Sequence, residues 1–179
     1  AHTLTFKAIG ADGEEITDAS IAKLTATSRG KTITSGSRVA AYTPIDFNVK
    51  LNDSYYVTSW ENAQANESDK SKATLNGWNA DTLVKVFIAK KPVVTFSGDE
   101  NKNITVTAMQ DGNKLTSDHW VEMSSGDIIF TATPKKGWET ANWNVTGWTQ
   151  ENNTANDNTT YTEKGEITKD VSISVTAQQ

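Results

Sequence analysis

Residues 117–119 read Ser-Asp-His, and Ser124 follows a few positions later. A hydroxyl, a carboxylate and an imidazole are the groups of a hydrolytic triad, but a triad also needs a geometry that close neighbours on one strand do not have. His119 alternates with Val121 and Met123, which is the pattern of an ordinary strand residue. We therefore expect no catalytic residues and no enzyme activity.

The sequence also predicts neither a metal site nor a cofactor. Cysteine is absent, which excludes disulfides, thiol nucleophiles and Cys-ligated zinc. The acidic groups at 12–15 and at Asp99-Glu100 lack the spaced oxygen ligands of a calcium loop and are typical of solvated turns. No glycine-rich phosphate-binding loop follows a strand and opens a helix. Paired carboxylates for glycoside hydrolysis would need a sugar-holding cleft, which small modules seldom provide.

The elements that must position these side chains occur twice. The stretch beginning Leu24-Thr-Ala-Thr27 is repeated from Val106-Thr-Ala-Met109, and each residue lies 82 positions after its counterpart over sixteen positions. After one inserted residue, aromatic positions correspond as well. These six residues are expected to form the structural core: Phe47 with Phe130, Tyr55 with Trp138, and Trp60 with Trp143. The closing strands align Val84 with Val171.

The repeat divides the chain into two β-rich modules, at 1–91 and 92–179. Apolar and polar residues alternate in segments such as 171–175, which is the period of a strand with one buried face. Arg29-Gly30 and Asp111-Gly112 indicate hairpin turns between strands. Residues 14–22 could form a short helix, and the polar stretches 61–74 and 150–160 are expected to be loops. The predicted fold class is all-β, with two small tandem repeat modules.

The composition of the chain limits the classes of partner that it can bind. The 179 residues are 36% hydrophobic, which suits two modest cores, and 17 basic against 22 acidic residues give a net charge of −5. The basic residues are spread along the chain, so we expect no nucleic-acid partner. No run approaches the roughly 18 apolar residues of a membrane span.

Three tryptophans do not recur between the copies and are the candidate binding residues: Trp78, Trp120 and Trp148. Trp120 aligns with Arg38, and the neighbouring Val121 takes the inward position, so alternation points Trp120 outward. An exposed indole is favoured at binding sites. The alternative is that loops cover these rings, or that they fill a contact between modules.

The second copy contains Phe130-Thr-Ala-Thr-Pro134, Gly137-Trp138 and Trp143-Asn-Val-Thr-Gly147, and it ends in an alternating Val/Ile strand after Asp170. This pattern resembles the InlB B-repeat family of bacterial repeat modules. The first copy lacks the Thr-Ala-Thr-Pro and Gly-aromatic segments. The resemblance implies a secreted or cell-surface bacterial protein in which such modules act as spacers, stalks or adhesive units.

Three functions remain open at this point. The first is a non-catalytic extracellular spacer or interaction and adhesion module with an unknown protein or glycan partner. The second is a carbohydrate-binding module that stacks sugars on Trp78, Trp120 or Trp148. The third is a secreted inhibitor or effector that presents the loop at 61–74 or 150–160. Two observations distinguish these three functions. Exposed tryptophans would favour the carbohydrate-binding module, and a rigid, ordered loop would favour the inhibitor or effector.

Overall fold

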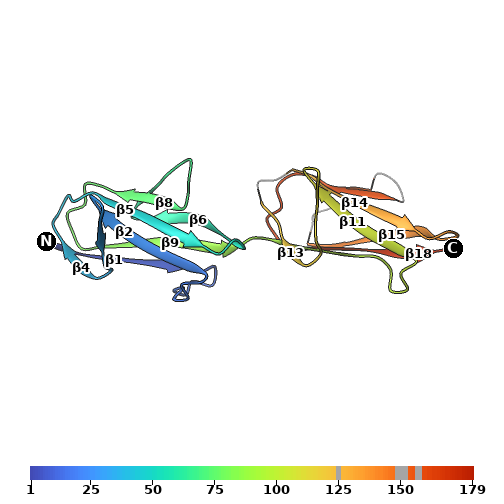
Figure 1. Ribbon diagram of the computed structural model, residues 1–179, viewed down its shortest axis with the longest axis horizontal. Coiled ribbons are helices and arrows are strands. Elements are labelled where there is room, and N and C mark those ends of the chain that lie inside the picture. Colours follow the sequence, from blue (N-terminus) through green and yellow to red (C-terminus); the bar gives the residue numbers. More distant parts are fainter. Residues whose placement is uncertain (124–125, 148–152, 156–158) are drawn as a thin grey trace. The chain divides into compact units, whose positions relative to one another are not determined.

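The computed structural model describes residues 1–123, 126–147, 153–155 and 159–179. All regular secondary structure in these residues is β-strand, which confirms the all-β prediction (Figure 1). The chain divides into two compact units, Ala1–Lys90 (unit 1) and Lys91–Gln179 (unit 2). The described part of the chain contains no helix that could cross a membrane.

Unit 1 consists of a mixed four-stranded sheet and an antiparallel five-stranded sheet. The four-stranded sheet has the order β4 (Ser37–Val39), β1 (His2–Ile9), β9 (Thr82–Lys90), β6 (Tyr55–Glu61). The five-stranded sheet has the order β3 (Lys31–Ile33), β2 (Ala22–Ser28), β5 (Ile45–Leu51), β8 (Lys72–Leu75), β7 (Gln64–Ala65). Strands β1 and β9 run parallel, whereas β6 runs antiparallel to β9.

Unit 2 has the same strand order and the same strand directions. Its four-stranded sheet is β13 (His119–Trp120), β10 (Val93–Ser97), β18 (Val171–Gln178), β15 (Glu139–Thr146). Its five-stranded sheet is β12 (Asn113–Lys114), β11 (Ile104–Gln110), β14 (Ile128–Pro134), β17 (Thr160–Glu163), β16 (Asn153–Ala155). Phe47 lies opposite Ala26, and Phe130 lies opposite Ala108, so the two aromatic residues hold the same place in the two units.

The register of the closing strands differs from the sequence alignment by two residues. Trp60 pairs with Val86, and Trp143 pairs with Val175, so Val175 corresponds to Val86 and Val84 corresponds to Ile173 rather than to Val171. A slip of two residues leaves every side chain on the same face of the sheet. The alternating pattern alone therefore could not detect it.

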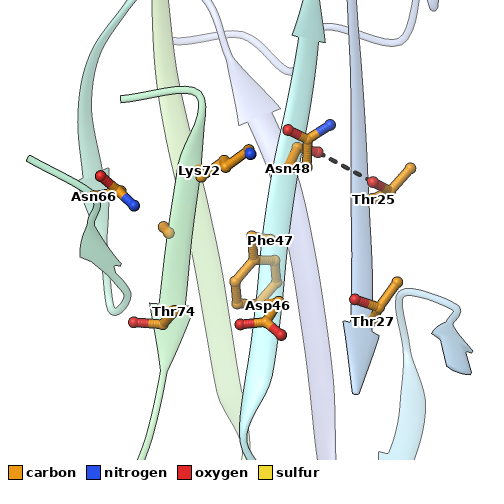
Figure 2. Close-up of a pocket in the computed structure, with 9 residues that line it drawn as sticks. Thr25, Thr27, Asp46, Phe47, Asn48, Asn66, Lys72 and Thr74 are labelled. Carbon is orange, nitrogen blue, oxygen red and sulfur yellow. Dashed lines mark hydrogen bonds between the residues drawn. The ribbon is translucent and has the colours of Figure 1, made fainter. Parts of the chain in front are cut away.

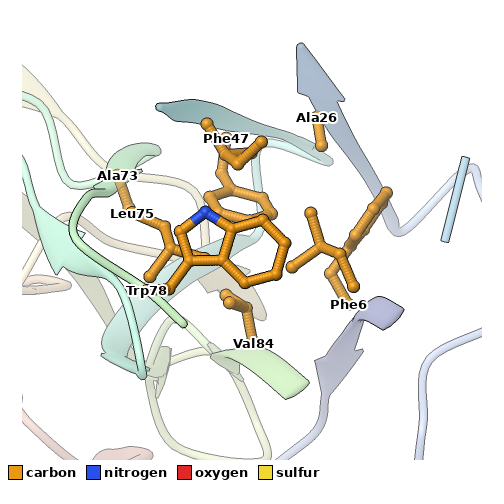
Figure 3. Close-up of a cluster of buried hydrophobic side chains, with 9 residues drawn as sticks. Phe6, Ala26, Phe47, Ala73, Leu75, Trp78 and Val84 are labelled. Carbon is orange, nitrogen blue, oxygen red and sulfur yellow. The ribbon is translucent and has the colours of Figure 1, made fainter. Parts of the chain in front are cut away.

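The core of each unit lies between its two sheets. In unit 1 the buried residues of one cluster come from both sheets and are Leu4, Phe6, Ala26, Ile45, Phe47, Ala73, Leu75, Trp78 and Val84 (Figure 3). The corresponding cluster of unit 2 includes Val94, Ala108, Ile128, Phe130, Tyr161 and Ile173. Each unit is thus a β-sandwich whose inward residues come from alternate positions along the strands.

The hairpin turns at Arg29-Gly30 and Asp111-Gly112 are confirmed. All four residues have positive φ, from 49° to 80°, and each turn joins two paired strands through two residues. Positive φ at both central positions defines a type I′ turn, whose twist matches that of the flanking strands. Glycine adopts this conformation without a Cβ clash, which explains its recurrence at the second position.

The short helix expected at 14–22 is not formed. Glu15 instead bridges to Ile9, and the Gly10 N–H bonds to the Glu14 carbonyl. The Asp18 carboxylate accepts hydrogen bonds from the Ser20 N–H and hydroxyl. Side chains of this type compete with helical hydrogen bonding and favour turns, which is why the helix prediction was wrong.

The prediction of a loop over 61–74 was also wrong in part. Residues 64–65 form β7 and residues 72–75 form β8, because Ala73 and Leu75 alternate into the core. Residues 62–63 and the connection between β7 and β8 remain irregular. Most of the second expected loop, 150–160, lies outside the described residues.

Candidate functional site

The Ser-Asp-His segment is not arranged for catalysis. The Ser117 hydroxyl accepts a hydrogen bond from the Phe96 N–H at 2.8 Å and donates to the Phe96 carbonyl at 2.9 Å. Ser35 makes the same two bonds to Phe6 in unit 1. The recurring serine therefore ties the turn before an edge strand to β1 or β10, and its hydroxyl hydrogen is already donated to a backbone carbonyl. Nδ1 of His119 lies 2.9 Å from the Trp120 carbonyl oxygen.

Trp120 lies on the edge strand β13 and is half-buried. Its neighbour Val121 is buried in the core, so the alternation that points Trp120 away from the core holds. However, the Lys91 ammonium lies 4.3 Å from the centre of the indole ring and 2.7 Å from the Glu122 carboxylate. A cation from the same unit therefore already occupies one face of the ring.

Trp78 is only 6% exposed and packs among Phe6, Phe47 and Val84 (Figure 3). Its indole N–H donates to the Thr43 carbonyl at 2.7 Å. The turn at Gly77, with φ of 68°, precedes the ring as it enters the core. This position does not fit the exposed sugar platform expected for Trp78. Trp148 lies outside the described residues.

The recurring aromatic residues occupy two kinds of environment. Phe47 and Phe130 are buried, at 2% and 0% exposure. Trp60 and Trp143 are half-buried, and each packs against both hydrophobic clusters of its unit. Tyr55 packs against a cluster that contains Val49 and Ile88.

Trp138, the counterpart of Tyr55, lines a groove in unit 2, although the sequence places it among the core residues. The groove has a volume of about 530 Å³. It lies over β15 and β18 and the segment that follows β10, and its walls are polar apart from the indole and the ends of Val175 and Ala177. The polar lining residues are Ser97, Asp99, Glu100, Asn101, Asn103, Asn144, Ser174 and Thr176.

One rim of this groove is a tightly built turn. The Asp99 carboxylate accepts hydrogen bonds from the Ile104 N–H at 2.6 Å and from the Asn103 side-chain amide at 3.2 Å. A Cβ on Gly98 would lie 1.9 Å from the Ile104 carbonyl oxygen, so only glycine permits this close approach. The carboxylate at the rim is therefore held in place by one backbone group and one side chain of the same turn.

The equivalent face of unit 1 carries different side chains. Where unit 2 has Asn144 beside Ser174, unit 1 has Glu61 beside Lys85, which form an ion pair at 3.8 Å. Phe87 stands at the position of Thr176. The strand pairing is shared, and the surface chemistry is not.

Unit 1 has its own shallow groove on the outer face of β2, β5 and β8, with a volume of about 340 Å³ (Figure 2). Polar residues that alternate with the core line it: Thr25, Thr27, Asp46, Asn48, Asn66, Lys72 and Thr74. The Thr25 hydroxyl donates to the Asn48 carbonyl at 3.2 Å. In unit 2 the pair corresponding to Thr27 and Asp46 is Met109 and Ile129, both exposed.

The connection between β7 and β8 is ordered by its own side chains. The Asn66 amide oxygen accepts from Ser68, and the Asp69 carboxylate accepts from Ser71. The Ser71 hydrogen bonds hold the pKa of Asp69 below its usual value. The Lys70 carbonyl accepts the Trp60 indole N–H. A segment folded into successive Asx turns is not the extended chain that an inhibitory loop presents.

Glu163 is a buried carboxyl group that sequence reasoning did not single out. It is 5% exposed and lies opposite Ile128, at the place that Leu75 occupies in unit 1. Its Oε2 atom is buried and has no hydrogen-bond partner among the described residues. Burial, with a smaller contribution from the Asp127 charge, raises the pKa of Glu163 to about 7. Among the described residues, no group of three or more His, Cys, Asp or Glu side chains is placed to hold a metal ion.

No protein-family model matches the chain, and no curated protein matches it. Among solved structures, the chain is similar to a C-terminal fragment of the pilus adhesin SpaC from Lactobacillus rhamnosus GG. The TM-score is 0.32 and the identity 11%, over 99% of this chain and 98% of that chain. Similarity at this level does not identify a common fold. The resemblance to the InlB B-repeat family stays a prediction from the sequence pattern, and function has to follow from the residues of this chain.

Proposed function

We propose that the chain is a non-catalytic pair of β-sandwich modules of a bacterial cell-surface or extracellular protein, and that it serves as a spacer and interaction unit. One observation carries this proposal: the two units repeat their strand order and most of their inward positions, and they differ most on their outer faces. The strand order, the type I′ turns and the serine bridges to Phe6 and Phe96 occur in both. The residues over the grooves do not.

This distribution fits a binding module better than an enzyme. A repeated framework provides a stable support, and variation at surface positions changes what each unit can contact without altering its fold. The Ser-Asp-His segment of unit 2 supports this assignment. Its serine, Ser117, bonds to the backbone of Phe96 in the same way as Ser35 of unit 1 bonds to the backbone of Phe6. A glycan or a protein is the partner class that such faces suit.

The proposal is tested on the organism's own cells. An antibody raised against the 179-residue chain should label intact cells or the culture medium, and external protease should remove the cell-bound signal. A signal that appears only after lysis contradicts the proposal. Incubating the purified chain with arrays of matrix proteins and glycans then separates an interaction role, which gives specific binding, from a spacer role, which gives none.

A further inference from the structure

We infer that the groove beside Trp138 in unit 2 is a binding site for a neutral glycan. This inference rests on the proposed interaction role and specifies the partner class. It moves the sugar platform from the non-recurring tryptophans, which the sequence favours, to a tryptophan that has a counterpart in the other unit. We choose Trp138 because of the residues that surround it, and not because unit 1 has an aromatic residue, Tyr55, at the same position.

The size of the groove suits a sugar residue. Its volume of about 530 Å³ falls within the roughly 300–1,000 Å³ of sites that bind small ligands. The indole of Trp138 is half-buried, which leaves part of the ring to contact a ligand. The lining comes from paired strands and from a turn that is tied down by Asp99, so most of the surface is formed before a ligand arrives.

The chemistry of the lining also matches a sugar. A pyranose has one face of C–H groups, which packs on an aromatic ring, and a periphery of hydroxyl groups, which need donors and acceptors. Trp138 offers the ring. Asn144, Ser174 and Thr176 offer amide and hydroxyl groups from two adjacent strands. A purely apolar ligand would leave these polar groups without partners.

Charge selects among the sugars. Asp99 and Glu100 line the groove, and no lysine or arginine is among its lining residues. Carboxylates accept hydrogen bonds from sugar hydroxyls, but they repel carboxylate and sulfate groups at short range. The site should therefore accept neutral hexoses or N-acetylated sugars and reject uronic-acid or sulfated glycans.

Unit 1 provides an internal comparison. Its corresponding face carries the Lys85–Glu61 ion pair and Phe87 in place of Ser174, Asn144 and Thr176. The large side chains take the room that the smaller ones leave open in unit 2. We therefore assign the glycan site to unit 2 alone.

The test is affinity electrophoresis and NMR titration of the whole chain. The probes are neutral polysaccharides (β-glucan, mannan, xylan) and soluble oligomers of glucose, mannose, xylose and N-acetylglucosamine, with polygalacturonate and heparin as acidic probes. At least one neutral probe should retard the chain and shift the Trp138 indole N–H signal, and the acidic probes should do neither. Trp138→Ala should weaken binding by roughly tenfold or more, the effect expected when an aromatic contact is lost.

Two repeat-guided variants and one control locate the site. Trp138→Tyr, which introduces the unit 1 residue, should keep measurable binding. Thr176→Phe introduces the residue type that unit 1 has at this place, Phe87. Because Thr176 is exposed, this variant should block the groove and leave the melting temperature unchanged. Thr107→Ala, on the outer face of the other sheet, should bind like the parent chain.

The inference is overturned if no neutral probe binds, if binding survives both Trp138→Ala and Thr176→Phe, or if acidic glycans bind equally well. If a protein array gives a specific ligand while every glycan fails, the glycan inference falls and the interaction role stands. If the native chain is found inside cells, the proposed function falls whatever the glycan result.

Discussion

Glu163 should make the stability of unit 2 fall as the pH rises from about 4.5 to about 7. The carboxyl is buried beside Ile128, and its pKa is raised from 4.5 to about 7 in the folded chain. Below pH 4.5 the group is protonated in both the folded and the unfolded state and has no effect. Between about pH 4.5 and 7 the unfolded state loses its proton while the folded state keeps it, so the free energy of unfolding decreases. Above pH 7 the loss is complete and constant.

The size of the effect follows from the shift. Each unit of pKa corresponds to about 1.4 kcal/mol, so the full shift would lower the free energy of unfolding by roughly 3 kcal/mol. Partial access of water to the carboxyl reduces this loss to about 2 kcal/mol. Small domains are stable by only about 5–15 kcal/mol, and 1 kcal/mol changes the melting temperature by roughly 4–8 °C. Replacing the carboxyl by an amide in Glu163→Gln should therefore raise the melting temperature of unit 2 at pH 8 by about 10 °C and leave it almost unchanged at pH 4.

Hydrogen–deuterium exchange of the whole chain measures this effect unit by unit. After correction for intrinsic exchange rates, protection of β14 should decrease from pH 4.5 to pH 8 in the parent and not in Glu163→Gln. Strand β5 serves as the reference in unit 1. The hydrogen bonds from Ser20 and Ser71 lower the pKa values of Asp18 and Asp69, so any pH effect in unit 1 runs in the opposite direction and appears only on acidification. A variant with the same pH dependence as the parent would refute the assignment to Glu163.

Three further stability measurements follow from the comparison of the units. The Trp60 indole N–H donates to the Lys70 carbonyl, whereas the Trp143 indole N–H is buried without a partner among the described residues, so Trp60→Phe should cost about 1 kcal/mol more than Trp143→Phe in denaturant unfolding. Arg29→Asn should stabilise unit 1 by about 0.5–1 kcal/mol in thermal melting, because asparagine tolerates the positive φ of a type I′ turn better than arginine. Ser117→Ala should destabilise unit 2 by about 1–3 kcal/mol by chemical denaturation, because both backbone groups of Phe96 lose their hydroxyl partner. Equal costs for the two tryptophans, a lower melting temperature for the asparagine variant, or an unchanged midpoint for the alanine variant would each contradict the reasoning.

The sequence predicted the parts of the fold that depend on period and spacing. Alternating apolar residues identified the strands, and a residue pair ending in glycine identified both hairpin turns. The closing strands show the limit of this method. Val84 and Val86 lie on the same face of the sheet, as do all residues two positions apart in a strand. The alternating pattern therefore allowed Val84 to be aligned with Val171. The pairing of Trp60 with Val86 and of Trp143 with Val175 excludes that alignment.

The candidate site was harder to predict, for the same reason. Trp138 follows a turn in a position that looks like that of Tyr55, and nothing in its immediate sequence distinguishes a core residue from a groove wall. The difference lies in Asn144 and Thr176, which strand pairing brings to the same groove as Trp138. With the alignment shifted by two residues, Thr176 would be compared with Ala89 instead of Phe87, and the contrast between an open and a filled groove would disappear.

Glu163 and Trp138 together indicate how two units with one fold can acquire different properties. At each of these positions unit 1 has a residue that packs against a hydrophobic cluster, Leu75 or Tyr55, whereas unit 2 has a buried carboxyl, Glu163, or a ring that lines a groove, Trp138. In the case of Glu163 the substitution weakens the interior, because an unpaired carboxyl replaces a leucine. In the case of Trp138 it adds a ring to a surface whose neighbours have become small and polar. We therefore expect Glu163→Leu to stabilise unit 2 at neutral pH without affecting glycan binding, since the carboxyl is not among the residues that line the Trp138 groove. If this variant lost binding while it gained stability, the buried carboxyl and the groove would be coupled, and the separation between interior and surface argued from the repeat would be wrong.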